Sequence, residues 1–165
     1  MINKVRLNKK LKVLIFGSGS IGTHHANAAI SLNCDVFITD KKDSQLINMC
    51  ENIYPGRYGK WNKKIKIISY SQVFFLKYHF DIIIIGVPPK NHLSLIKLCK
   101  KNLKFKKILV EKPLCVYDEN FNFLKKKDFR DKVFCGYNHS ISKSFLYFLK
   151  NLKNFLKKNK SNIKI

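Results

Sequence analysis

Short apolar blocks alternate along the chain with longer stretches in which apolar positions recur every three or four residues. The short blocks are typical of strands that are covered on both faces, and the longer stretches are typical of amphipathic helices. Strands are expected at Val13–Phe16, Asp35–Thr39, Ile65–Ile68, Asp81–Gly86, Lys107–Val110 and Lys132–Gly136. Helices are expected at Ile21–Leu32, Lys42–Asn52, Asn91–Asn102 and near Tyr117–Lys126. This alternation predicts βαβ units and an α/β fold with a doubly wound parallel sheet.

Two segments depart from the alternation. Residues 54–59 read Tyr-Pro-Gly-Arg-Tyr-Gly, which predicts a polar turn before the third strand. Ser144–Lys158 has phenylalanine and leucine at helical spacing with lysines between them, so it predicts a basic amphipathic helix. Such a helix packs on a sheet, or it binds a membrane surface or a partner. Packing is favoured, because the position of this helix in the chain is that of the first helix of a second domain.

Charge is the most unusual feature of the composition. The 165 residues include 45% hydrophobic residues, enough for the core of one domain, and carry a formal charge of +23. A balance this basic suggests nucleic acid or an anionic membrane surface. However, the lysines are spread along the whole chain, and only three of the 33 basic residues are arginine, which nucleic-acid sites use for bidentate contacts. We therefore interpret the charge as a solvated surface and expect no nucleic-acid partner.

The remaining composition indicates a cytoplasmic protein. No apolar run approaches the roughly 20 residues that a membrane span needs. Val13–Phe16 is too short for the apolar region of a signal peptide. The five cysteines are odd in number and show neither a CxxC pair nor the Cys/His spacing of a metal site. We expect reduced thiols, no metal and no membrane span.

The strongest local motif is Gly17-Ser18-Gly19-Ser20-Ile21-Gly22, which follows the first predicted strand and opens the first predicted helix. In a loop of this spacing Gly17 permits the tight turn, Gly19 lets the main chain approach a pyrophosphate, and Gly22 allows close packing of helix and strand. The free N–H groups and the dipole at the start of the helix then bind the phosphates. The motif predicts a dinucleotide site on a Rossmann fold.

Asp40 supports this prediction, because it ends the second strand about 20 residues further on, as the fingerprint requires. Its carboxylate can accept both ribose hydroxyls of an adenosine. The same charge would repel a 2′-phosphate, so NAD is favoured over NADP, although Lys41 and Lys42 weaken that preference. The alternative for Asp40 is a helix N-cap or a turn residue.

Three further motifs follow the later strands. Gly86-Val87-Pro88-Pro89-Lys90-Asn91-His92 follows the fourth strand, Glu111-Lys112-Pro113 the fifth, and Gly136-Tyr137-Asn138-His139 the sixth. Together with the glycine loop they resemble, in order and spacing, the N-terminal half of the Gfo/Idh/MocA oxidoreductases, named after glucose–fructose oxidoreductase and inositol dehydrogenase. The resemblance extends from about Leu11 to Lys158, and Glu-Lys-Pro after a buried strand is its most discriminating part.

The resemblance implies NAD(P)-dependent hydride transfer at a carbinol of a sugar, a cyclitol or a sugar derivative. It assigns Lys112 a catalytic place beside the nicotinamide and the substrate hydroxyl. An ammonium there can stabilise a developing alkoxide or relay its proton. Glu111 is expected to position the Lys112 amine, and Pro113 to fix the turn through a cis peptide bond. The alternative is one surface lysine among many.

Other residues beside the cofactor are also implied by the resemblance. Val87-Pro88 is expected to shape the loop under the nicotinamide ribose, and His92 matches a histidine beside the cofactor, with the start of a helix as its alternative interpretation. Asn138 matches an asparagine that faces the active cleft. His24 and His25 follow the glycine loop and are interpreted as helix-surface or packing residues.

Members of the resembled family continue into a second α/β domain, which contributes an aspartate and a histidine that act with the lysine. We therefore expect residues 1–137 to form the dinucleotide-binding domain and residues 138–165 a linker and the first helix of a truncated second domain. The predicted function is NAD(P) binding with little or no activity alone. A sugar-like substrate is expected if a second domain completes the chain, and a homo-oligomer or a separate catalytic chain is the expected protein partner. The alternative is a non-catalytic NAD-binding module that docks a partner through its C-terminal helix. An intact Glu111-Lys112-Pro113 favours the first interpretation.

Overall fold

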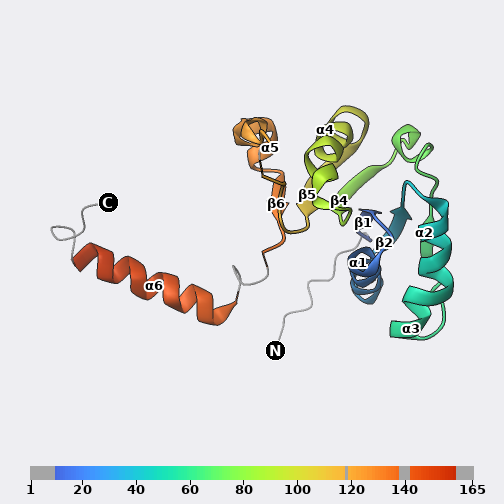
Figure 1. Cartoon of the computed structure of the whole chain (residues 1–165), viewed down its shortest axis with the longest axis horizontal. Coiled ribbons are helices and arrows are strands. Elements are labelled where there is room, and N and C mark those ends of the chain that lie inside the picture. The colour runs from blue at the N-terminus through green and yellow to red at the C-terminus, as the bar shows by residue number, and fades with distance from the viewer. Residues whose placement is uncertain (1–9, 118, 138–141, 159–165) are drawn as a thin grey trace. The chain divides into compact units, whose positions relative to one another are not determined.

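A computed structural model describes residues 10–117, 119–137 and 142–158 (Figure 1). Its strands are β1 (Lys12–Phe16), β2 (Asp35–Thr39), β3 (Ile65–Ile67), β4 (His79–Ile85), β5 (Lys104–Val110) and β6 (Val133–Cys135). Its α-helices are α1 (Ser20–Ser31), α2 (Asp43–Asn48), α3 (Tyr54–Tyr58), α4 (His92–Asn102), α5 (Lys127–Arg130) and α6 (Lys143–Lys158). The strands all lie within one or a few residues of the predicted positions.

The six strands form one parallel sheet in the order β3-β2-β1-β4-β5-β6. The chain builds outward from β1 to β3, then returns to place β4 beside β1 and builds outward on the other side. The predicted doubly wound α/β fold is therefore confirmed. In such sheets ligands bind at the carboxyl ends of the strands where the order reverses, which here is the crevice between β1 and β4.

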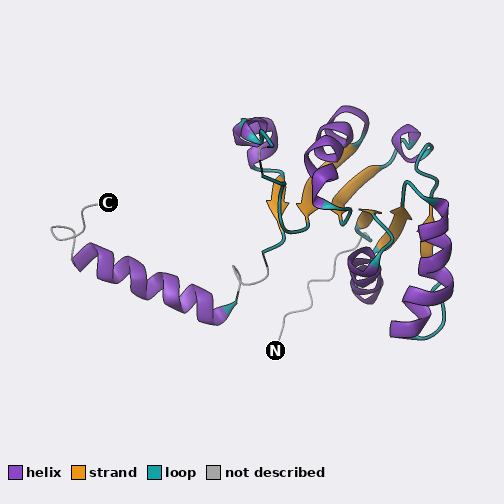
Figure 2. Ribbon diagram, viewed as in Figure 1, coloured by secondary structure: helices purple, strands orange, loops and turns teal. Residues whose placement is uncertain are grey.

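Alternate residues of β1 point into two separate hydrophobic cores. Val13 and Ile15 pack on the face covered by α1, α2 and α3, where Ala26 and Met49 are also buried. Leu14 and Phe16 pack on the opposite face, which α4 covers. Figure 2 shows the helices on both sides of the sheet. Because β1 is covered on both faces, its sequence is continuously apolar, as a central parallel strand requires.

The turn predicted at residues 54–59 is wrong, because the helix that begins at Asp43 continues to Tyr58. A π-helical turn at Met49–Ile53 joins α2 to α3, whose second residue is Pro55. A proline inside an α-helix clashes with the carbonyl four residues earlier, and the wider π turn relieves that clash. Tyr54 anchors the segment: it is 3% exposed, and its hydroxyl donates to Asn27 Oδ1 at 3.0 Å.

The helix predicted near Tyr117–Lys126 is also wrong. Among the residues of this region that the structure describes, only a 3₁₀ turn at Asn122–Lys125 and the short α5 form. Polar side chains there accept hydrogen bonds from the nearby main chain: Glu119 Oε2 from Val116 N at 2.9 Å and Asn120 Oδ1 from Asn122 N at 2.9 Å. Such local bonds compete with helix formation, which the apolar spacing alone does not reveal.

The chain divides into two compact units, Met1–Cys135 and Gly136–Ile165. The first contains the whole sheet. The second contains α6, whose start at Lys143 is one residue from the predicted start of the basic amphipathic helix. Within the described ranges, none of the helices is long and apolar enough to cross a bilayer.

Candidate functional site

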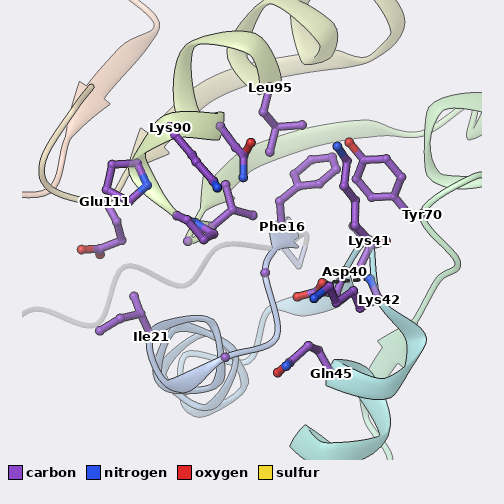
Figure 3. A pocket seen from close by; sticks show the side chains of 18 of the residues that line it. Phe16, Ile21, Asp40, Lys41, Lys42, Gln45, Tyr70, Lys90, Leu95 and Glu111 are labelled. Atoms are coloured by element: carbon purple, nitrogen blue, oxygen red, sulfur yellow. Dashed lines mark hydrogen bonds between the residues drawn. The ribbon is translucent and has the colours of Figure 1, made fainter. Parts of the chain in front are cut away.

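A cavity of about 1000 Å³ lies at the carboxyl ends of β1, β2, β4 and β5, at the crevice where the strand order reverses (Figure 3). This volume is at the upper end of the range for small-molecule sites. The segments that follow these four strands form its walls, together with the first turns of α1, α2 and α4. The lining includes the predicted residues Gly17, Gly19, Ser20, Ile21, Asp40, Val87, Pro88, Glu111 and Lys112.

The glycine loop packs against neighbouring main chain with no side chain between. Gly17 has φ +101°, and a Cβ there would lie 2.7 Å from the Gly86 carbonyl oxygen. A Cβ on Gly22 would lie 1.8 Å from the Gly17 carbonyl oxygen. A Cβ on Gly19 would meet nothing within 4 Å, since that glycine borders the open cavity. Gly17 and Gly22 therefore maintain the turn, while Gly19 leaves room for a ligand.

The first turn of α1 has no side-chain hydrogen bond capping its start. The first N–H groups of a helix have no partner within the helix itself. These groups and the helix dipole form an anion site at the edge of the cavity. The loop therefore fits the phosphates of a dinucleotide.

Asp40 connects the end of β2 to the glycine loop. Its Oδ2 accepts hydrogen bonds from the Ser18 main-chain N–H at 2.8 Å and the Ser18 hydroxyl at 3.1 Å, and its Oδ1 accepts one from Lys42 N–H at 3.1 Å. Ser18 is fully buried, so it acts on the cavity through Asp40 instead of lining it. Asp40 also lines the cavity. Sequence reasoning placed Asp40 here without finding this bracing role.

His92 lies behind the cavity wall and does not line it. It is fully buried at the start of α4. Its Nε2 lies 2.7 Å from the Val87 carbonyl oxygen, and its Nδ1 lies 3.0 Å from that of Pro113. Depending on the tautomer, either Nε2–H donates to the Val87 carbonyl or Nδ1–H donates to the Pro113 carbonyl. His92 therefore holds the loop after β4 against the segment after Lys112. It does not lie beside the cavity as predicted, and it can affect a cofactor there only by positioning that loop.

Glu111 and Lys112 follow β5 and line the cavity, and Glu111 lies on the side far from Asp40 (Figure 3). The Glu111 main-chain N–H donates to the Ile85 carbonyl at 3.0 Å, which fixes the main chain beside β4. The Lys112–Pro113 peptide bond is cis, as predicted. The carboxylate of Glu111 pairs with His25 Nε2 at 2.7 Å, and no ion pair joins it to Lys112 among the described residues. The expected direct positioning of the Lys112 amine by Glu111 is therefore not seen.

The cavity lining also includes aromatic and apolar side chains that sequence reasoning missed. These are Phe16, Tyr70, Leu95 and Leu98. Burial, with a smaller contribution from Cys99, raises the pKa of Tyr70, so its phenol stays protonated at neutral pH. No local motif marks these residues, because they come from three separate segments that only the fold brings together. Asn138 lies outside the described residues, and no cluster of three or more potential metal ligands occurs within the parts of the chain that are described.

Comparison with known protein families identifies the chain. Residues 11–131 match the family model described as the oxidoreductase family with an NAD-binding Rossmann fold, the Gfo/Idh/MocA family. The chain belongs to this family. No functionally curated protein matches it significantly.

Solved structures agree with the family. A putative myo-inositol dehydrogenase from Sinorhizobium meliloti is 23% identical, with a TM-score of 0.61 over 88% of this chain and 41% of that one. A myo-inositol dehydrogenase from Corynebacterium glutamicum is 25% identical, with a TM-score of 0.59 over the same shares. A scyllo-inositol dehydrogenase from Lactobacillus casei, solved with NAD(H) and scyllo-inositol, is 18% identical, with a TM-score of 0.59 over 90% and 42%. The chain thus spans less than half the length of these relatives.

The two ends of the glycine loop predict different effects of an added methyl group. Gly22→Ala is expected to lower the free energy of unfolding by about 3 kcal/mol or more, or to abolish cooperative unfolding, because main chain must move to admit the Cβ. Gly19→Ala is expected to change it by no more than about 0.5 kcal/mol, since its Cβ enters open space. Urea unfolding followed by circular dichroism measures both. Equal losses in the two variants would contradict this account of the loop.

Proposed function

We propose that the cavity binds NAD(H) and that the chain is the cofactor-binding half of an oxidoreductase acting on a CH–OH group of a sugar, a cyclitol or a sugar derivative. The observation that carries the proposal is the meeting of three features at one cavity: the glycine loop, Asp40 and the Glu111-Lys112-Pro113 segment. The glycine loop suits the pyrophosphate and Asp40 the adenosine ribose, and the family resemblance implies that Glu111-Lys112-Pro113 faces the nicotinamide.

The residues present fit the adenosine end and the pyrophosphate. Gly19 and the uncapped start of α1 offer N–H groups to phosphate. Asp40 Oδ2 already accepts two hydrogen bonds from Ser18, whereas Oδ1 accepts one from Lys42 and retains an acceptor site for a ribose hydroxyl. The side chains of Tyr70 and Leu95, which also line the cavity, suit contact with an adenine ring. The negative charge of Asp40 favours NAD over NADP, and Lys41 and Lys42 reduce the margin.

Lys112 supports the second part of the proposal, the reaction at a CH–OH group. A bound nicotinamide supplies the hydride acceptor or donor. Lys112 lines the same cavity, and an ammonium beside the nicotinamide can stabilise the oxygen of a substrate carbinol as its proton leaves. The match of Glu111-Lys112-Pro113 to the family motif supports a position of this lysine beside the nicotinamide, and the inositol dehydrogenases among the similar structures support a polyol substrate.

Replacing Asp40 with asparagine tests the cofactor assignment. Asp40→Asn keeps an acceptor for Ser18 but removes the negative charge, so the ratio of NADPH to NADH affinity is expected to rise about tenfold. Asp43→Asn is the matched control: Asp43 starts α2 three residues away and does not line the cavity, so the ratio is expected to stay within about twofold. Calorimetric titration of the full chain with each nucleotide measures both. Failure of the unmodified chain to bind either nucleotide would overturn the proposal.

We also propose that the chain alone has little or no dehydrogenase turnover. Lys112 is exposed, and one ammonium supplies neither a closed substrate pocket nor a full set of acid and base groups. The purified chain mixed with NAD and myo-inositol, or another polyol, is expected to produce no NADH above background. Robust NADH production by the unmodified chain, abolished in Lys112→Ala, would contradict this and show that the chain is sufficient for catalysis.

A further inference from the structure

The contact between His25 and Glu111 joins two parts of the site that are 86 residues apart in the sequence. His25 lies on α1, three residues after the last glycine of the loop, and its Nε2 lies 2.7 Å from Glu111 Oε1. Both side chains are largely buried, at 24% and 20% exposure, so the pair is shielded from most of the solvent. The contact connects the phosphate-binding helix to the residue directly before Lys112.

The Glu111 main chain is already fixed by its hydrogen bond to the Ile85 carbonyl. What remains free is its side chain, which has three rotatable bonds and borders the cavity. His25 is the partner of its carboxylate among the residues that the structure describes, and it engages only Oε1. A carboxylate held by one oxygen keeps the other as a hydrogen-bond acceptor in a set direction.

Resting on the proposed function, we propose that His25 is a positioning residue for the nicotinamide half of the cofactor site. It holds the Glu111 carboxylate against α1, so that Oε2 accepts an N–H or O–H from the nicotinamide riboside. Without His25 the Glu111 carboxylate is free to rotate. Cofactor binding must then order it, and the lost side-chain entropy weakens the affinity. The adenosine half and the pyrophosphate, which bind at Asp40 and the glycine loop, do not depend on the pair.

The neighbouring histidine provides a matched control. His24 occupies the next position of the same helix, but its ring contacts Tyr58 OH and Arg57 Nη1, which belong to α3. None of these three residues lines the cavity. Loss of His24 therefore removes a histidine and its hydrogen bonds from α1 without touching Glu111.

The test is calorimetric titration of the full chain with NADH and with ADP, which has the adenosine and two phosphates but no nicotinamide riboside. His25→Ala is expected to weaken NADH binding about tenfold and ADP binding less than twofold. His25→Gln, which keeps an N–H donor at the end of the side chain, is expected to recover NADH affinity to within about threefold of the unmodified chain. His24→Ala is expected to leave both affinities within about twofold.

A double-mutant cycle separates positioning from a general structural effect. If His25 acts through Glu111, adding His25→Ala to Glu111→Ala produces no further loss of NADH affinity. Additive losses, equal losses for NADH and ADP, or a matching loss in His24→Ala would each overturn the inference while leaving NAD binding intact. An unmodified chain that binds ADP but not NADH would overturn it as well. An unmodified chain that binds neither nucleotide would overturn the proposed function itself.

Discussion

The close approach of main chain at the turn between β1 and α1 is the constraint on which the site depends. Gly17 N–H donates to the Thr39 carbonyl at 2.9 Å, and Gly86 N–H donates to the Phe16 carbonyl at 2.8 Å, so the turn is bonded to strands on both sides. The carbonyl of Gly17 fills the place where a Cβ of Gly22 would lie. Only glycines permit this packing, and it brings the uncapped start of α1 to the crevice between β1 and β4.

Three polar links then arrange the loops around that turn. Asp40 holds Ser18, His92 holds the carbonyls of Val87 and Pro113, and His25 holds Glu111. Each link joins segments that follow different strands or helices, and each lies largely out of the solvent. A cavity whose walls are fixed before binding loses less entropy when a ligand enters. The links therefore explain how a small parallel sheet maintains a long cavity lined by loops.

The sequence predicted the sheet well because its signals are local. Each strand is a short apolar run such as Asp81–Gly86, and the glycine loop is a fixed spacing beside one of these runs. The alternation of strands and helices then restricts the connections to a doubly wound parallel sheet, which the observed strand order confirms. The family resemblance had the same local basis and agrees with the match over residues 11–131.

Several errors and omissions share a cause, since they depend on residues that meet only in the fold. Pro55 predicted a turn, but burial of Tyr54 and the π-helical segment before it keep the helix intact. His25 was interpreted as a helix-surface or packing residue, and its contact with Glu111, 86 residues later, is visible only in the fold. His92 matched a motif for a residue beside the cofactor, whereas the fold buries it one layer behind. No local sequence pattern reveals contacts between residues that are this far apart in the chain.

The central claim is that a nicotinamide dinucleotide lies along the cavity from Asp40 to Lys112. The most direct measurement is an NMR titration of the full chain with NADH, following the main-chain amide signals. The account predicts saturable shifts confined to residues after the carboxyl ends of β1, β2, β4 and β5, with those of the glycine loop among the largest. Shifts concentrated at the lysine-rich start of β5, or no saturable shifts at all, would contradict it.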